Sequence, residues 1–422
     1  MADRRAALGA PFAAGALVVG IGLSVRSPIT SVAALLPELE RDFELGASGA
    51  AWLSTIPVLL FGLAAPIAPP LARRLGADRA AAVLLSALAL AMLLRPLGTV
   101  PLLLGTVVVG ASISLLGILT PQLVRTHLDR RHGLWSGVYT AAFGASAALG
   151  ASLAVPMLSF TGDSAAIAVG LWGLPVVAAA VLAWAVLPRL SGAAARLPER
   201  STPRGPGSIL RAPRMWSVTG FFAAQALIYF ALTAWLPTIA VDRGLAPSQA
   251  GLLLAWMSVA GIPAALLAPT IAAGFRTQSG VIAVVSACSV LGILGLAFAP
   301  IALAPAFVAV LGIAQSAAFG LAVGLIVARA PDAARTSAFS AVAQGAGYAV
   351  AALGPLTLGL LSSAGVPWTP LIAGLSLVAG AQLAFGLAPG RPAPRGPLAS
   401  PRVPRRANRR STAGPATTRR SP

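Results

Sequence analysis

The sequence predicts an all-α membrane protein whose twelve transmembrane helices form two six-helix halves. Of its 422 residues, 57% are hydrophobic and 10% are charged, and the mean hydropathy is +0.85. Soluble domains carry about 25% charged residues. Apolar runs of about 20 residues, the length that crosses a bilayer, recur along the whole chain. Basic residues gather in alternate segments between these runs.

Each predicted span fits a bilayer of about 30 Å at 1.5 Å rise per residue. The spans are 11–36, 48–71, 80–98, 101–124, 134–158, 164–187, 215–240, 248–273, 279–299, 302–329, 336–363 and 367–388. Several contain proline, such as Pro57 and Pro263, which membrane helices tolerate because neighbouring helices satisfy the freed backbone groups. No cleavage site follows "MADRR", so the first run is expected to remain a transmembrane helix.

Two halves are expected because the sequence contains an internal repeat. "LLPELERDFELGASGAAWLS" from Leu35 parallels "WLPTIAVDRGLAPSQAGLLL" from Trp235. The segment between the sixth and seventh spans is rich in Pro, Gly, Ser and Arg, which predicts a linker. We expect an N-terminal half over 1–187, a cytoplasmic linker over 188–214, a C-terminal half over 215–388 and a disordered tail over 389–422. Such a parallel repeat has its substrate site between the halves near the bilayer midplane.

The net charge of +19 comes from 30 basic residues, all of them arginine. They gather at the start of the chain, in alternate loops, in the linker and in the tail, a distribution that sets membrane topology and excludes a nucleic-acid-binding face. The positive-inside rule predicts that both termini are cytoplasmic. Arginine-only usage with abundant Ala, Gly and Pro indicates a bacterial inner (plasma) membrane protein. We expect the tail to lie against anionic lipid and the protein to be a monomer.

None of the eleven acidic residues lies inside a predicted span. Proton-coupled carriers usually place Asp, Glu or His in their spans, but both histidines, His127 and His132, fall in a loop. Carboxylate-pair, metal-dependent and Ser-His-Asp chemistry lack components in the bilayer, so we expect neither an enzyme nor a metal site. The single Cys288 excludes an intrachain disulfide. No nucleotide-binding motif occurs, and no cofactor is expected; a coupling proton or ion is left open.

Arg26 is the basic residue deepest within a predicted span, about 15 residues or 22 Å from the cytoplasmic start of its helix. One interpretation is that its side chain reaches the outer interface, or pairs with a carboxylate such as Glu38. The interpretation we favour is a cation in a central cavity, attracting an anionic or strongly dipolar substrate, because intramembrane charges usually mark function. Arg95 lies near its helix end, where a structural contact or an interfacial position is favoured.

Neutral polar residues lie at a depth similar to that of Arg26. Glutamine and tyrosine occur four residues apart, and therefore on one helix face, in two spans. A membrane glutamine alone often only joins helices by hydrogen bonds, but the convergence of the set favours a binding cavity. The candidate substrate-binding residues are Arg26, Gln225, Tyr229, Gln315, Gln344 and Tyr348. Tyr139 lies closer to the cytoplasmic end, where a gate and simple packing are equally compatible with its position.

The sequence resembles the cyanate and 2-nitroimidazole transporter family of the major facilitator superfamily. The likeness is carried by "VRSPITSVAALLPELERDFELG", "RTHLDRRHGLWSGVYTAAFGASAALG", "AQALIYFALTAWLPTIAVDRGLAPSQAGLLL" and "AVAQGAGYAVAALGPLTLGLL". Arg26 matches the arginine of the family's Arg-Pro-Xaa-Ile-Thr-Ser segment, although Ser27 follows it here and the proline comes at Pro28. Gln225 and Tyr229 match the polar face of the seventh helix. Substrate identity is not carried over, because of the displaced proline.

The resemblance implies secondary active transport of a small solute, either an anion such as cyanate or a nitro-aromatic compound, by alternating access. A multidrug exporter of the same fold is the alternative, and a non-transporting receptor or scaffold is a third class. In the loop after the second span, an arginine stands where the superfamily usually has Asp, so gating is expected to use other partners, such as Asp78 or Asp129. The residues expected to take part in gating are Arg73, Arg74, Gly76, Asp78, Arg79 and Asp129.

Overall fold

The computed structural model describes residues 2–194 and 210–390, and every regular element in these ranges is helical. The first range forms α1 (Ala2–Ser24), α2 (Ser27–Ala34), α3 (Leu36–Asp42), α4 (Gly46–Leu63), η1 (Ala65–Ile67), α5 (Ala68–Leu75), α6 (Ala77–Leu94), η2 (Arg95–Leu97), α7 (Thr99–His127), η3 (Asp129–Arg131), α8 (His132–Ser152), α9 (Ala154–Phe160), α10 (Ala165–Leu171) and α11 (Gly173–Ala194). The second forms α13 (Pro213–Asp242), α14 (Pro247–Gly274), α15 (Ser279–Phe298), η4 (Ile301–Leu303), α16 (Ala304–Arg329), α17 (Ala333–Ala351), α18 (Leu353–Ser363) and α19 (Trp368–Gly390). The predicted all-α class is confirmed.

The described helices cover all twelve predicted positions. Ten of them are long and apolar enough to cross a membrane, judged by length and composition, and the bent pair Thr55–Leu63 and Ala65–Leu75 makes eleven. The remaining position, the predicted fifth span, is taken by α8 and α9, which are not among the ten. Residues 195–209 of the predicted linker and 391–422 of the predicted tail lie outside the described residues. The boundaries of the two halves therefore stay a prediction, although α11 continues to Ala194, beyond the expected end of the sixth span.

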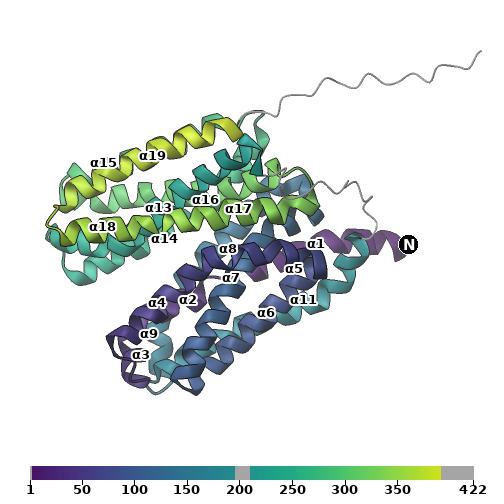
Figure 1. The fold of residues 1–422 in the computed structure, drawn as a ribbon, viewed down its shortest axis with the longest axis horizontal. Coiled ribbons are helices and arrows are strands. Elements are labelled where there is room, and N and C mark those ends of the chain that lie inside the picture. Colours follow the sequence, from purple (N-terminus) through teal and green to yellow (C-terminus); the bar gives the residue numbers. More distant parts are fainter. Residues whose placement is uncertain (1, 195–209, 391–422) are drawn as a thin grey trace, which may run out of the picture. The chain divides into compact units, whose positions relative to one another are not determined.

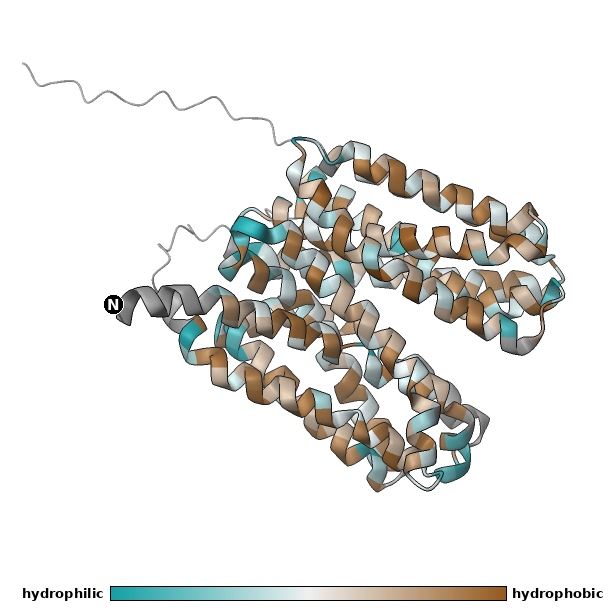
Figure 2. Cartoon of the chain, turned by 180° about the vertical axis from the view of Figure 1, so that it is seen from behind, coloured by the Kyte–Doolittle hydropathy of each residue, from teal (hydrophilic) through white to brown (hydrophobic). Residues whose placement is uncertain are grey.

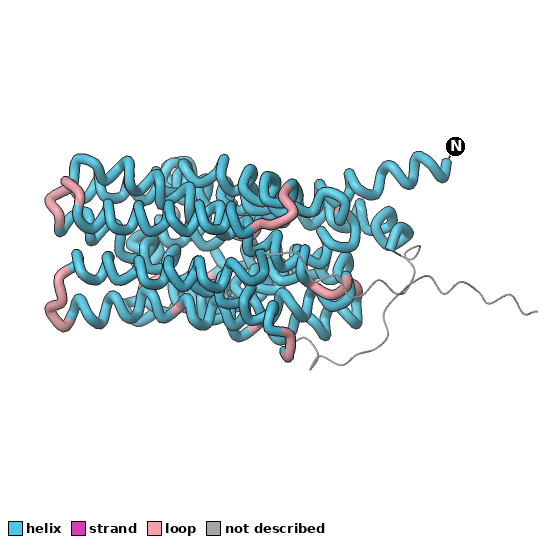
Figure 3. Tube along the Cα trace, turned by 90° about the horizontal axis from the view of Figure 1, so that it is seen from above, coloured by secondary structure: helices cyan, strands magenta, loops and turns pink. Residues whose placement is uncertain are grey.

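Several spans are broken rather than continuous. Between α1 and α2 the helix is interrupted at Val25 and Arg26, and proline stands at the beginning of α2. Because Pro28 has no backbone N–H and its ring clashes with the preceding turn, it favours an interruption at this point. Similar junctions separate α8 from α9, α10 from α11, and α17 from α18. Figure 3 shows the helices running beside one another, with the loops gathered toward their ends.

Apolar side chains fill the spaces between helices and also cover their outer faces. One buried cluster is drawn mainly from α1 to α11, and two others from α13 to α19. Large apolar side chains also point outward, including Leu63 at 72% exposure and Leu377 at 80%. Figure 2 shows this hydrophobic colouring along the outer helices. Such an exterior suits lipid rather than water as the solvent.

The first six spans meet the last six through a few close helix contacts (Figure 1). α8 packs along α14, and α17 packs against α4, α5 and α7. The approach of α8 to α14 depends on glycine, because a Cβ at Gly133 would stand 2.7 Å from the carbonyl oxygen of Pro269. A Cβ at Gly137 would likewise clash with the backbone of Leu266. Small residues allow helix backbones in membranes to approach this closely.

Candidate functional site

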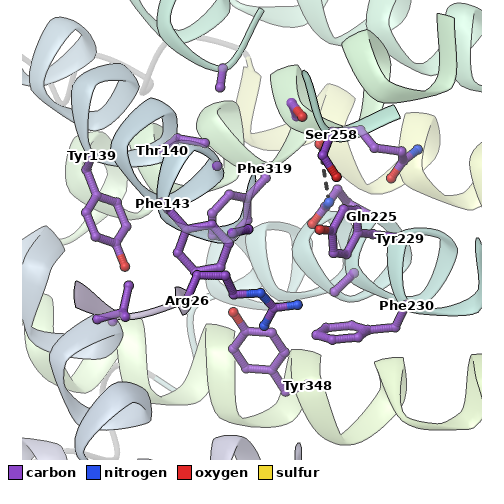
Figure 4. A pocket seen from close by; sticks show the side chains of 18 of the residues that line it. Arg26, Tyr139, Thr140, Phe143, Gln225, Tyr229, Phe230, Ser258, Phe319 and Tyr348 are labelled. Carbon is purple, nitrogen blue, oxygen red and sulfur yellow. Dashed lines mark hydrogen bonds between the residues drawn. The ribbon is translucent and has the colours of Figure 1, made fainter. Parts of the chain in front are cut away.

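A cavity of about 80 Å³ lies where helices from both parts of the described chain meet. It is lined by all six residues that the sequence analysis singled out for substrate binding. They come from four separate places in the chain: Arg26 from the junction of α1 and α2, Gln225 and Tyr229 from α13, Gln315 from α16, and Gln344 and Tyr348 from α17. Figure 4 shows Arg26, Tyr229 and Tyr348 around this space. The structure therefore brings the six together, and their role in binding stays a prediction.

The break between α1 and α2 is held by one hydroxyl group on α8. Ser146 Oγ accepts hydrogen bonds from the backbone N–H of Ser27 at 2.9 Å and of Arg26 at 3.3 Å, and it donates to the carbonyl oxygen of Leu23 at 2.6 Å. Backbone groups freed by a helix break in a membrane need partners, because hydrocarbon supplies none. Ser146 supplies them and so fixes the backbone at Arg26. Ser146 was not predictable from the sequence, since a serine within an apolar span carries no sign of which distant backbone it contacts.

The Arg26 guanidinium is buried in the cavity among aromatic rings. The side chain is 9% exposed, and its guanidinium carbon lies 5.4 Å from the ring centre of Phe143 and 5.7 Å from that of Phe230. Within the described ranges, Nε has no hydrogen-bond partner and no carboxylate lies within ion-pair distance of Arg26. Glu38, the expected rival partner, instead lies 3.5 Å from Arg41. Cation–π contacts stabilise the guanidinium by about 0.5–2 kcal/mol each. This is less than the several kcal/mol that removing a charge from water costs.

Arg95, in contrast, makes a structural contact and does not line the cavity. It is 2% exposed, and it donates a hydrogen bond of 3.0 Å to Thr106 Oγ1 and one of 3.4 Å to the carbonyl oxygen of Pro28. Room for the side chain depends on Gly105, where a Cβ would stand 2.7 Å from Arg95 Cγ. The favoured structural interpretation of Arg95 therefore agrees with its contacts.

The glutamines of the cavity both join helices and leave acceptor atoms unused. Gln225 donates to the backbone carbonyl of Gln315 at 3.3 Å, and Gln315 donates to Ser289 Oγ at 3.0 Å. Gln344 donates to the carbonyl of Gly117 at 3.1 Å. In the part of the chain that the structure describes, the Oε1 atoms of Gln225 and Gln315 are buried without a partner. They are unpaired acceptor atoms on residues that line the cavity.

Aromatic rings form much of the cavity wall. The Tyr348 ring lies 5.3 Å from Phe61, 5.1 Å from Phe222 and 6.1 Å from Phe230 between ring centres. On the opposite side of Arg26, Phe143 lies 5.2 Å from Phe319. Four of these phenylalanines line the cavity: Phe61, Phe143, Phe230 and Phe319. They were missed in the sequence, because a phenylalanine inside an apolar span does not differ in pattern from one facing lipid or the core. Tyr139 also lines the cavity and is buried, so its position does not separate a gate from packing.

The predicted gating residues fall into paired and exposed groups. Asp78, at the start of α6, lies 2.8 Å from Nε2 of His127 at the end of α7, so this pair joins the ends of two helices. Asp129, the first residue of η3, pairs at 2.8 Å with Arg125 in the last turn of α7. Gly76 has a φ of +76°, a conformation that suits glycine. Arg73, Arg74 and Arg79 are exposed, as are Gly76 and Asp129. The role of these residues in gating stays a prediction.

Known families and relatives resemble this chain over most of its length. The profile described as the Major Facilitator Superfamily matches residues 12–309. The 2-nitroimidazole transporter of Escherichia coli (strain K12) is 31% identical over 89% of this chain and 94% of its own length. The cyanate transport protein CynX of the same organism is 27% identical, over 82% and 89%. An uncharacterized transporter of Bacillus subtilis (strain 168), YycB, is 29% identical, over 83% and 87%.

Solved structures share the fold at low sequence identity. FucP of the same superfamily, in its outward conformation, aligns with a TM-score of 0.72 at 14% identity, covering 90% of this chain and 99% of FucP. The proton:xylose symporter XylE aligns with a TM-score of 0.70 at 13% identity, covering 90% and 94%. At this level of identity the likeness concerns the fold alone.

Proposed function

This chain belongs to the major facilitator superfamily, and on that premise we propose that it is a secondary active transporter of a small planar solute that works by alternating access. The solute we propose is a small anion such as cyanate or a nitro-aromatic compound such as 2-nitroimidazole, the solutes named for two of its relatives. The chain is a multi-pass membrane transporter rather than an enzyme. Cytoplasmic termini and a monomeric state are part of the proposal, which leaves a coupling proton or ion open.

The unpaired guanidinium of Arg26 carries this proposal. It is a buried cation with an unsatisfied N–H, aimed into a cavity whose other lining residues, as far as described, are uncharged. A carboxylate-like or cyanate oxygen would accept its hydrogen bond and compensate its charge, and a nitro oxygen would accept the hydrogen bond. The rings of Phe143, Phe230 and Tyr348 offer faces and edges to a planar solute.

The size of the cavity supports a small solute over a drug. Sites for drug-sized ligands usually occupy about 300–1,000 Å³, whereas this cavity measures about 80 Å³. A multidrug exporter of the same fold is therefore the less supported alternative.

The test is ligand-dependent thermal stability of the purified protein. A ligand at 100 times its Kd stabilises the folded state by about 2.7 kcal/mol. We expect cyanate or 2-nitroimidazole to raise the Tm of the wild-type protein and of Arg41→Gln, which removes an exposed arginine. Neither compound should raise the Tm of Arg26→Gln. The proposal fails if both compounds leave the wild-type Tm unchanged, or if they stabilise Arg26→Gln as much as the wild type.

A further inference from the structure

Arg26 has no counter-charge among the described residues. We propose that this transporter works as an anion exchanger: it carries the anionic form of its solute in one direction and must bind a second anion of the same class to return. This inference rests on the proposed function, because it assumes that the cavity around Arg26 is the transport site. It goes beyond that function by assigning the charge of the transported species and the coupling between its two directions.

Closing the cavity around Arg26 without a bound solute costs free energy. Alternating access passes through an arrangement in which the site is shut off from water on both sides. Arg26 is already 9% exposed, and the described residues give its Nε no hydrogen bond. Losing the remaining hydration without a counter-ion is costly for any buried charge. The rings of Phe143 and Phe230 compensate only part of this cost.

None of the acidic side chains that the structure describes lines the cavity. Glu38 lies against Arg41, Asp78 against His127, and Asp129 against Arg125. The described residues that line the cavity besides Arg26 are apolar residues, amides, hydroxyls and aromatic rings. The unpaired amide oxygens of Gln225 and Gln315 are dipoles and do not neutralise a full charge. Neutralisation therefore falls to the solute.

The lack of a counter-charge also affects the rate at which the transporter passes through the closed arrangement. A bound monovalent anion makes the site neutral, so the loaded transporter crosses the closed arrangement faster than the empty one. Each tenfold difference in rate corresponds to 1.36 kcal/mol of barrier, and leaving a charge buried and unpaired costs more than that. Return without an anion is then the slow step, and the presence of anion on the far side accelerates transport. Exchange of one monovalent anion for another moves no net charge, so the membrane potential does not drive it.

The test uses the purified full-length protein in liposomes buffered with a large organic anion. The initial uptake of radiolabelled cyanate and of radiolabelled 2-nitroimidazole is measured into vesicles that are either empty or preloaded with the same unlabelled compound. We expect uptake of at least one probe to be at least tenfold faster into preloaded vesicles. A potential imposed with potassium and valinomycin should leave the preloaded rate unchanged. Arg41→Gln, the matched control for loss of an arginine, should behave like the wild type.

The possible outcomes separate this inference from the function on which it rests. Equal uptake into empty and preloaded vesicles would overturn exchange while supporting transport, and so would uptake into preloaded vesicles that follows the imposed potential or a pH gradient. Uptake of neither probe under any condition, by protein whose folding is verified by its thermal transition, would overturn the proposed function and the exchange together.

Discussion

At the scale of single residues, the chemistry of the site depends on where one charge lies relative to its neighbours. Arg26 and Arg95 are both buried arginines in an apolar bundle. The Nε atom of each is without a hydrogen-bond partner among the described residues. Arg95 donates through its other two nitrogens to Thr106 and Pro28, whereas Arg26 lies between two aromatic rings and lines the cavity. Burial alone therefore does not identify a binding residue. The distinguishing property of Arg26 is that it lines the cavity without a carboxylate partner among the described residues.

Replacing Arg26 should abolish transport without preventing insertion. In cells that express Arg26→Ala, we expect uptake or efflux per molecule at the membrane to fall at least tenfold, because truncating one partner of a buried, hydrogen-bonded charge pair costs about 2–5 kcal/mol. The measurement is radiolabelled solute flux normalised to the amount of protein in isolated membranes. Arg41→Gln is the control, and flux of Arg26→Ala equal to that of the control would remove Arg26 from the mechanism.

His132, the first residue of α8, is expected to make stability depend on pH. Its pKa is lowered from the usual 6.5, first by burial and then by Arg125 and Arg329, while Asp129 opposes the shift. Because the folded protein binds the proton less readily than the unfolded chain, stability is full above about pH 6.5 and is lost as the pH falls below it.

The measurement for His132 is Tm as a function of pH in detergent. We expect the Tm of the wild-type protein to decrease more between pH 7.5 and about pH 5.5 than that of His132→Gln, whose side chain does not titrate. The same decrease in both proteins would show that other groups cause the acid sensitivity.

At the scale of elements, the break between α1 and α2 determines where Arg26 points. Its sequence signal, Pro28 within an apolar run, was visible, but the partner of the break was not. Ser146 lies on another helix and satisfies the backbone N–H groups of Arg26 and Ser27. The two hydrogen bonds join residues that are separated by 120 and 119 positions in the chain. Contacts at such a separation leave no periodic pattern in the sequence. The polar face of α13, in contrast, was predictable because Gln225 and Tyr229 are four residues apart on one helix.

Ser146→Ala should therefore damage both stability and binding. Leaving buried backbone donors unsatisfied costs about 1–3 kcal/mol, and the freed backbone no longer fixes Arg26. We expect a lower Tm and weaker stabilisation by the solute, both measured by thermal denaturation with and without solute. Ser159→Ala, which removes an exposed serine hydroxyl from α9, is the control. Solute stabilisation of Ser146→Ala equal to that of the control would contradict the positioning role.

At the scale of the whole molecule, the two sets of six spans are held together by close contacts between α8 and α14. These contacts depend on Gly133 and Gly137, which admit the backbone at Pro269 and Leu266. α8 also carries Ser146, so the helix that holds the break at Arg26 is the one that packs against the opposite set of helices. Alternating access requires such contacts to separate and re-form during each cycle.

Adding a side chain to α8 at its contact with α14 should destabilise the described arrangement of helices. A Cβ at Gly137 would clash with the backbone of Leu266, and overpacking of this kind costs about 1–3 kcal/mol. We expect Gly137→Ala to lower the Tm and to slow transport. Gly280→Ala serves as the control, because nothing lies within 4 Å of its added Cβ. Wild-type Tm and transport in Gly137→Ala would show that the α8–α14 contact does not limit the cycle.

The sequence by itself determined the membrane class, the positions of the helices and the one deep intramembrane cation. These depend on local properties: the length of apolar runs, the distribution of arginine between them, and the cost of charge in hydrocarbon. Only the tertiary structure decided that Arg26 has no carboxylate partner among the described residues, that phenylalanines surround it, and that Ser146 holds its backbone. Those facts are contacts between helices far apart in the chain, which hydropathy and spacing do not encode.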